Sequence, residues 1–195
     1  MITNQIYNSR VSGRMHWIEK VVGELERRGD EKVVLSTGKT PSGHVHVGIS
    51  RELIYCSAFE RLLRDRGLET DFLFFIDSMD PVKRFPPYIP RDLAEYVGTP
   101  MCGVPCPEGC CASYAEHFGN LLLRNLGPFG LSPRVIWTHE LYRRPEMQDL
   151  IRKTLRDVDA VRQILIDVVG PTLAPARFER FKTRVRSLIP CQVVC

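Results

Sequence analysis

The sequence predicts an α/β fold in which helices flank a parallel β-sheet, and three apolar segments support this class. A β-branched run at Val33–Leu35 leads through a loop into a helical apolar pattern over residues 47–66. The run TDFLFFI at 70–76 is short enough for a strand buried on both faces, as is typical of parallel sheets. RVIWT at 134–138 is a third strand candidate. Strand, helix and strand in this order predict a βαβ unit.

Length and composition are those of a globular protein. The 195 residues suffice for one core with an appendage, and the hydrophobic (44%) and charged (26%) fractions are ordinary. No apolar run is long enough to span a membrane, and the first nine residues lack the apolar centre of a signal peptide. We therefore expect a cytoplasmic protein without a membrane partner. The net charge of +4 permits a polyanionic partner without demonstrating one.

The chain divides into five expected segments. They are a loose polar extension (1–14), the first βαβ unit (15–76), an insertion rich in Pro, Gly and Cys (77–112), further helices and a strand (113–170), and a basic linker (171–195). An amphipathic helix over 16–28, ending at Gly29, precedes the first strand. Residues 113–126 and 139–169 read as helical, and the second stretch is interrupted or bent near Pro145.

The loop between the first strand and its helix is the strongest candidate for a ligand site. Its sequence, TPSGHVHVG at 40–48, ends where the helix begins. A helix N-terminus presents free N–H groups and the positive end of the helix dipole, which bind phosphates. Gly48 would let a nucleotide approach the backbone closely. The alternative is that the loop histidines only cap or pack, but the whole string favours a nucleotide site.

Two carboxylates follow the second strand. Ligands of parallel sheets bind outside the carboxyl ends of the strands, so Asp77 and Asp80 face the same crevice as the loop. They could orient a substrate ammonium group or a metal-bound nucleotide. Equally, they could cap the turn before Pro81, which is a frequent role of Asp.

The cysteines favour reduced thiols, because the chain has seven of them and no export signal. Cys102, Cys106, Cys110 and Cys111 cluster in the insertion, but their spacing lacks the paired C-x-x-C of zinc sites. We therefore expect no metal there. Cys191 and Cys195 have no second pair to complete a site. The basic run at 177–186 fits either RNA phosphates or a solvated helix face.

Several strings, in the same order, resemble class I lysyl-tRNA synthetases, the type found in archaea and some bacteria. They are TGKTPSGHVHVGISREL, IDSMDPVKRFPPYIP, EYVGTP, GCCASYAEHF and WTHELYRR. His46-Val47-Gly48 matches the first three positions of the HIGH signature of class I enzymes. The resemblance implies a Rossmann-like catalytic domain, of which this chain is the first half. It also implies a lysine–tRNA ligase that uses ATP with Mg²⁺ to form lysyl-adenylate and transfers lysine to tRNA(Lys) in translation.

The resemblance further implies roles for individual residues. His46 would be the catalytic residue and would donate to the phosphates. The ATP-binding region would comprise Pro41, Ser42, Gly43, His44, Val45, His46, Val47, Gly48 and Ile49, and the lysine-binding residues would be Gly38, Thr40 and Asp77. No metal ligand is assigned. Cys195 looks like the first cysteine of a zinc-containing insertion, so zinc is expected only further along the family's chain.

Two departures from the family pattern shape the functional expectation. Ile49 stands where the family has a polar residue, which would remove one hydrogen bond near the nucleotide. No string resembles KMSKS, whose lysines stabilise the leaving pyrophosphate, so we expect the isolated chain to be weak or inactive and to need a complementing C-terminal half. The alternatives are a truncated paralogue that binds nucleotide, lysine or tRNA without aminoacylating, and a small nucleotidyltransferase of the same fold.

Overall fold

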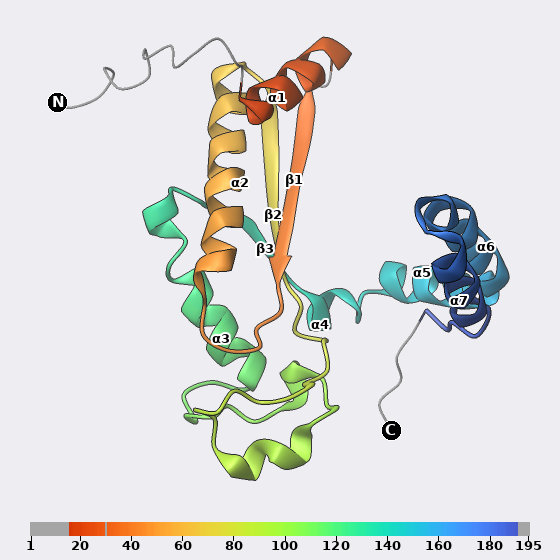
Figure 1. Ribbon diagram of the computed structural model, residues 1–195. Coiled ribbons are helices and arrows are strands. Elements are labelled where there is room, and N and C mark those ends of the chain that lie inside the picture. The colour runs from red at the N-terminus through yellow and green to blue at the C-terminus, as the bar shows by residue number, and fades with distance from the viewer. Residues whose placement is uncertain (1–15, 30, 191–195) are drawn as a thin grey trace.

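A three-stranded parallel sheet lies at the centre of the computed structural model, which describes residues 16–29 and 31–190. Its strands are β1 (Lys32–Lys39), β2 (Glu69–Ile76) and β3 (Arg134–Trp137), in the order β1–β2–β3 (Figure 1). The expected α/β class and βαβ unit are therefore confirmed. The extension predicted for residues 1–14, and the cysteines at 191 and 195, lie outside the described residues.

Six of the seven described helices lie in segments predicted to be helical, and the seventh lies in the expected basic linker at 171–195. The helices are α1 (Trp17–Arg28), α2 (Val47–Asp65), α3 (Tyr114–Leu123), α4 (Thr138–Leu141), α5 (Pro145–Arg156), α6 (Val158–Val169) and α7 (Pro175–Arg186). Short 3₁₀ turns occupy Arg91–Tyr96, Met101–Gly103, Gly127–Phe129 and Gly170–Thr172. Of the two expected possibilities near Pro145, the structure has the interruption: α4 ends at Leu141, and α5 starts at this proline, whose fixed φ suits the first helical position.

Side-chain caps fix where the helices around the sheet begin. His16 forms a capping box with Glu19 at the start of α1, which ends at Gly29 in the left-handed conformation. His46 caps α2 by accepting a hydrogen bond from the Gly48 N–H, and Ser113 caps α3. The caps of α2 and α3 thus set where these two helices start beside the carboxyl edge of the sheet.

The core lies on one face of the sheet. Phe72, Phe74 and Ile76 alternate along β2 and pack against Leu53 of α2 and Leu122 of α3. A second cluster joins α1 to the same face. The opposite face is less covered: Leu73 and Phe75 are half-buried, and Val34 is 56% exposed. The prediction that β2 is buried on both faces was thus wrong, because the described helices α1, α2 and α3 pack on one face only.

The insertion at 77–112 folds around its own small core below the carboxyl ends of the strands (Figure 1). It contributes turns and 3₁₀ segments instead of strands, apart from one bridge between Pro81 and Pro100. Five buried side chains of the insertion (Val82, Ile89, Leu93, Met101 and Val104) pack with Tyr114, Ala115 and Phe118 of α3. Helix α3 therefore belongs to two cores at once, that of the sheet and that of the insertion.

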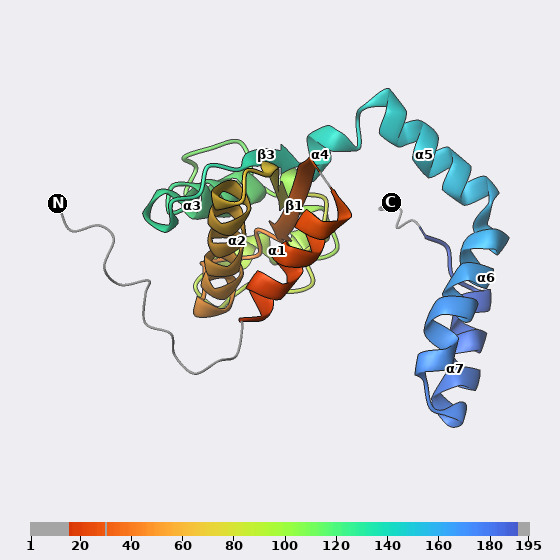
Figure 2. The same cartoon turned by 90° about the horizontal axis from the view of Figure 1, so that it is seen from above.

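Helices α5, α6 and α7 form a separate unit, joined to the sheet through α4 (Figures 1 and 2). Several of its apolar side chains are exposed, among them Leu150, Leu155, Ile164 and Val168. Among the described helices, none is long and apolar enough to cross a membrane.

Two helical glycines test the packing of α3 on the sheet. A Cβ at Gly119 would lie 2.5 Å from Cη2 of Trp137, whereas a Cβ at Gly23 of α1 would meet nothing within 4 Å. We expect Gly119→Val to lower the free energy of unfolding by about 1–3 kcal/mol through overpacking. Gly23→Val, the matched control, should change it by less than about 1 kcal/mol. Urea denaturation measures both, and equal effects would contradict the packing described.

Candidate functional site

The carboxyl ends of the three strands lie in register at one edge of the sheet. Lys39 of β1 pairs with Ile76 of β2, which pairs with Trp137 of β3. The residues that follow these ends therefore converge, as expected for a parallel sheet. The Asp77 N–H donates to the Lys39 carbonyl at 3.1 Å, and the Thr40 hydroxyl donates to the Asp80 carboxylate at 2.7 Å. Asp80 thus holds Thr40 at the start of the loop at 40–48, which we call the signature loop.

A second group of polar residues ties the end of β2 to the end of β3. Ser78 is fully buried, and its Oγ lies 2.7 Å from Nδ1 of His139 while accepting from the His139 N–H at 3.1 Å. The Thr138 hydroxyl donates to the Ile76 carbonyl and accepts from the Met79 N–H. Because Ser78 is inaccessible, this serine–histidine pair positions the strand ends and is not a nucleophile. No local pattern in the sequence indicates these contacts, because they join residues about sixty positions apart.

The signature loop is anchored at both ends and open between them. Pro41 and Ile49 are buried, whereas the residues between them are exposed or half-buried. Helix α2 has no acidic residue in its first turn, so nothing in that turn neutralises the positive end of its dipole. The Gly48 N–H is already bonded to Nδ1 of His46 at 3.1 Å. This leaves the outer imidazole nitrogen, Nε2, of the exposed His46 side chain for a ligand.

Ile49 is buried at the start of α2. Its side chain is only 4% exposed and lies on the core side of the helix, and the predicted loss of a polar contact near the nucleotide stays a prediction. The cap at the start of α2 also explains a glycine at position 48, since a Cβ there would lie 2.8 Å from Cε1 of His46. The missing side chain leaves room for the imidazole ring over the start of the helix. Close approach of a nucleotide to Gly48 stays a prediction.

The three predicted lysine-binding residues lie together at the ends of β1 and β2. A Cβ at Gly38 would be 2.9 Å from the Phe75 carbonyl oxygen, so this strand pairing itself requires glycine. Burial and the neighbouring Asp80 raise the pKa of the Asp77 carboxyl, while Lys39 lowers it. A narrow cleft between the loop and α3 is lined by Lys39, Thr40, Pro41, Gly43, Val45, Ile76, Phe118, Gly119 and Leu122. Lysine binding by Gly38, Thr40 and Asp77 stays a prediction.

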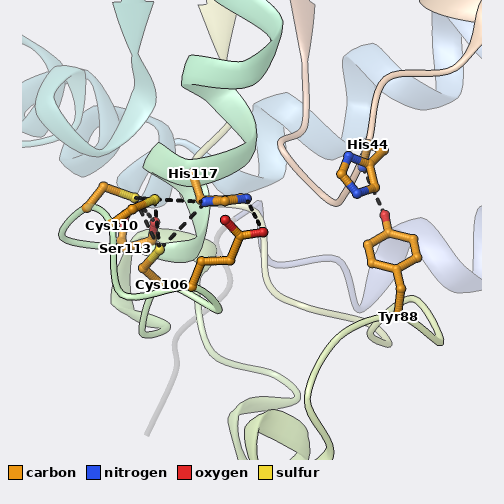
Figure 3. Close-up of polar contacts among 8 residues, drawn as sticks. His44, Tyr88, Cys106, Cys110, Ser113 and His117 are labelled. Atoms are coloured by element: carbon orange, nitrogen blue, oxygen red, sulfur yellow. Dashed lines mark hydrogen bonds and ion pairs between the residues drawn. The ribbon is translucent and has the colours of Figure 1, made fainter.

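Four potential metal ligands gather where the insertion meets α3 (Figure 3). The sulfur atoms of Cys106, Cys110 and Cys111 are 3.4–3.9 Å apart, and Nδ1 of His117 lies 3.2 Å from the Cys110 sulfur and 3.7 Å from that of Cys106. All four ligand atoms lie within 4.8 Å of one another. Zinc–sulfur bonds of about 2.3 Å give a tetrahedron with edges of about 3.8 Å. The arrangement therefore fits a tetrahedral Cys₃His zinc site.

The surroundings of this cluster also suit a cation. Burial alone would raise the pKa of the Cys106 thiol, but hydrogen bonds from the Glu108 backbone, the Cys111 side chain and neighbouring backbone groups lower it to about 6. Burial and the other two sulfurs raise the pKa of Cys111 to about 12. On the far side of the imidazole, Nε2 of His117 lies 3.8 Å from the Glu108 carboxylate. A carboxylate behind a ligating histidine is a common support of zinc sites.

The geometry favours a metal site where the sequence analysis expected none. The cysteine spacing alone was uninformative, because two ligands are adjacent in sequence and the fourth is a histidine one helical turn inside α3. Cys102 does not join them, since its sulfur lies 3.7 Å from that of Met79. The usable signal was His117, six residues after Cys111 and on the helix face that packs toward the insertion.

Comparisons with known proteins agree on one family. A family model described as "tRNA synthetases class I (K)" matches residues 15–195. Lysine–tRNA ligases are among the similar curated proteins: that of Methanosarcina barkeri is 36% identical over 160 residues, which is 82% of this chain and 30% of the relative. The ligase of Methanocaldococcus jannaschii is 35% identical over 152 residues, covering 77% of this chain and 29% of the relative. The chain thus spans about 30% of the length of these relatives.

Two aspartates at the sheet should affect stability with opposite signs. The pKa of Asp77 is raised, so the ionised carboxylate is disfavoured in the folded state. The stability of the fold therefore falls as the pH rises through that pKa. The pKa of Asp71 is lowered by its hydrogen bond with Arg134, so its contribution is present at neutral pH and is lost as the pH falls. We expect Asp77→Asn to stabilise the fold at pH 7 and Asp71→Asn to destabilise it.

Denaturation at pH 7 and pH 3 measures these effects. Both differences from the parent chain should shrink toward pH 3. There the Asp77 carboxyl is protonated in the folded state, and Asp71 is largely protonated in the unfolded state, so part of its stabilising contribution is lost. A stabilising effect of Asp77→Asn that is as large at pH 3 as at pH 7 would show that ionisation is not its cause.

Proposed function

The chain belongs to the class I tRNA synthetase family of the lysine type, and from this premise we propose that its signature loop binds ATP for the activation of lysine. The observation that carries the proposal is the exposed loop at 42–48, which joins a strand end to the uncompensated N-terminus of α2. A helix N-terminus in this position favours phosphate through its N–H groups and dipole. The chain spans only about 30% of the relatives' length, so the activity of the whole protein is proposed here too.

His46 is proposed as the donor to the phosphates. Its Nδ1 accepts a hydrogen bond from Gly48, so a neutral imidazole carries its proton on the other ring nitrogen, Nε2. That N–H would donate to a phosphate oxygen as negative charge moves during the reaction. A preorganised donor of this kind stabilises the transition state without reorganising at the moment of reaction.

The proposed reaction has two steps. The lysine carboxylate attacks the α-phosphorus of Mg²⁺-bound ATP, a P–O bond forms, and the bond to the leaving pyrophosphate breaks. A ribose hydroxyl at the end of tRNA(Lys) then attacks the carbonyl of lysyl-adenylate and releases AMP. This chain would contribute positioning: the loop for the nucleotide, and Gly38, Thr40 and Asp77 for lysine, whose ammonium group suits a carboxylate partner.

The macromolecular partner is proposed to be tRNA(Lys), which places the protein in the cytoplasm, where translation occurs. Helix α7 supports an RNA partner, because it carries five basic residues and one acidic residue over Pro175–Arg186. Lys and Arg side chains on one helix supply the phosphate contacts that dominate affinity for nucleic acids.

Binding of a non-hydrolysable lysyl-adenylate analogue tests the proposed site. His46 and His16 cap α2 and α1 in the same way, each accepting from the N–H two residues later. We expect His46→Ala to weaken binding at least about tenfold, the effect of losing a hydrogen bond to a charged group. His16→Ala, which removes the equivalent cap away from the site, should leave affinity unchanged. Calorimetry measures both affinities, and an equal loss of affinity in the two variants would show that His46 acts only as a helix cap.

We also propose that Cys106, Cys110, Cys111 and His117 bind one Zn²⁺ ion with a structural role. All four tetrahedral positions are filled by protein ligands, whereas a catalytic zinc keeps one position open. The ion would compensate the charge of the three thiolates and join the insertion to α3. In this role it takes no part in the chemistry of lysine activation.

Metal titration of the purified chain tests this site. We expect one Zn²⁺ per chain and, with Co²⁺, the visible absorption of tetrahedral thiolate coordination. Cys110→Ser should abolish the thiolate-dependent absorption or shift it strongly. Cys102→Ser, the matched control nearby, should leave stoichiometry and spectrum unchanged, because its sulfur contacts Met79 instead. Metal binding that depends equally on Cys102 would contradict the proposed ligand set.

A further inference from the structure

Two tyrosines hold the signature loop from opposite segments of the chain. The Tyr114 hydroxyl, from the first turn of α3, donates to the Ser42 carbonyl at 2.9 Å. The Tyr88 hydroxyl, from the insertion, accepts from the His44 N–H at 2.9 Å (Figure 3). The backbone on either side of Gly43 is therefore tied to elements that come more than forty residues later. We call these two contacts the tyrosine clasp.

The loop is shaped to fit the clasp. Gly43 has φ +155°, and a Cβ there would overlap the Tyr88 hydroxyl, so only glycine allows this approach. The His44 ring lies 4.7 Å from the ring of Tyr88 and 5.4 Å edge-on from Phe118. Backbone hydrogen bonds and ring contacts together fix residues 42–44, directly before the proposed phosphate-binding residues.

The clasp and the Cys₃His cluster share the first turn of α3. Tyr114 is 1% exposed and packs between Phe85 and Phe118, so its hydroxyl cannot swing independently of the helix. His117 lies one turn further along, on the cluster side. The Ser113 carbonyl accepts from the Cys111 thiol at 3.4 Å and from the His117 N–H at 3.0 Å. The position of this turn therefore determines both the ligand set and the reach of Tyr114.

We propose that Tyr88 and Tyr114 are positioning residues for the nucleotide loop and that metal bound at the Cys₃His cluster tightens the clasp through the first turn of α3. This inference rests on the proposed nucleotide and zinc sites. A metal ion draws Cys110, Cys111 and His117 to one point and so fixes the start of α3. Tyr114 then holds Ser42 in the conformation that the nucleotide needs. By linkage, metal and nucleotide raise each other's affinity by the same factor.

Amide hydrogen exchange of residues 41–46 tests the clasp without any nucleotide. We expect Zn²⁺, compared with a chelator, to slow exchange in this segment about two- to tenfold, the factor that one ordinary hydrogen bond provides. Tyr114→Phe keeps the buried ring but removes the donor, so the segment should exchange at the faster rate with or without Zn²⁺. Tyr96→Phe is the matched control: Tyr96 packs in the same insertion core and makes no side-chain hydrogen bond among the described residues, so the zinc response should persist.

Two results would overturn the coupling. One is a zinc response of equal size in the parent chain and in Tyr114→Phe. The other is no change in exchange on metal removal in a chain that has been shown to bind Zn²⁺. Far-UV circular dichroism of the metal-free chain reports whether α3 persists, and the comparison of the two chains decides the role of Tyr114 in either case.

Nucleotide affinity separates this inference from the proposed function. We expect chelation to weaken binding of the lysyl-adenylate analogue two- to tenfold in the parent chain and by a smaller factor in Tyr114→Phe. Tyr88→Phe should also weaken binding, while Zn²⁺ affinity stays unchanged when nucleotide is absent. A loop that responds to zinc but binds no analogue would refute the nucleotide site and leave the clasp intact. Analogue binding that does not depend on zinc would refute the coupling between metal and loop and leave the nucleotide site intact.

Discussion

The parallel register of β1, β2 and β3 is the constraint on which the candidate site depends. Pairing of Lys39 with Ile76 and of Ile76 with Trp137 brings three strand ends to one line. The signature loop, the two aspartates and the Thr138–His139 pair then follow within a few residues of these strand ends. A shift of one residue in this register would turn Phe72, Phe74 and Ile76 away from α2 and α3, because side chains alternate between the faces. The buried face thus fixes the site.

Local patterns were sufficient to predict most of this architecture. The apolar runs at 33–35 and 70–76 and the helical period after Val47 are short-range signals, and the structure places β1, β2 and α2 on them. The signature loop was predictable for the same reason, since strand, loop and helix are contiguous. What failed was the burial of β2 on both faces, because which face of a sheet is covered depends on where distant helices pack. The burial of the Ile49 side chain likewise depends on packing that the local sequence does not show.

The insertion could not be predicted in the same way because its contacts are non-periodic. The Cys₃His cluster joins a loop to a helix, and its adjacent cysteines match no paired spacing. The two tyrosine contacts connect residues separated by 44 and 72 positions, and no local pattern indicates them. In both cases the decisive residues, His117 and Tyr114, lie on a helix whose apolar period alone would assign them to a core.

The uncovered side of β1 has a consequence for how the polypeptide assembles during synthesis. All three strands lie within residues 32–137, so the sheet can form once these residues have left the ribosome. Within the described residues β1 pairs only with β2, and its other edge carries unpaired backbone groups beside the exposed Val34. Such an edge attracts strands from other nascent chains. Chaperones that shield this edge in the newly made chain would therefore lower its risk of aggregation.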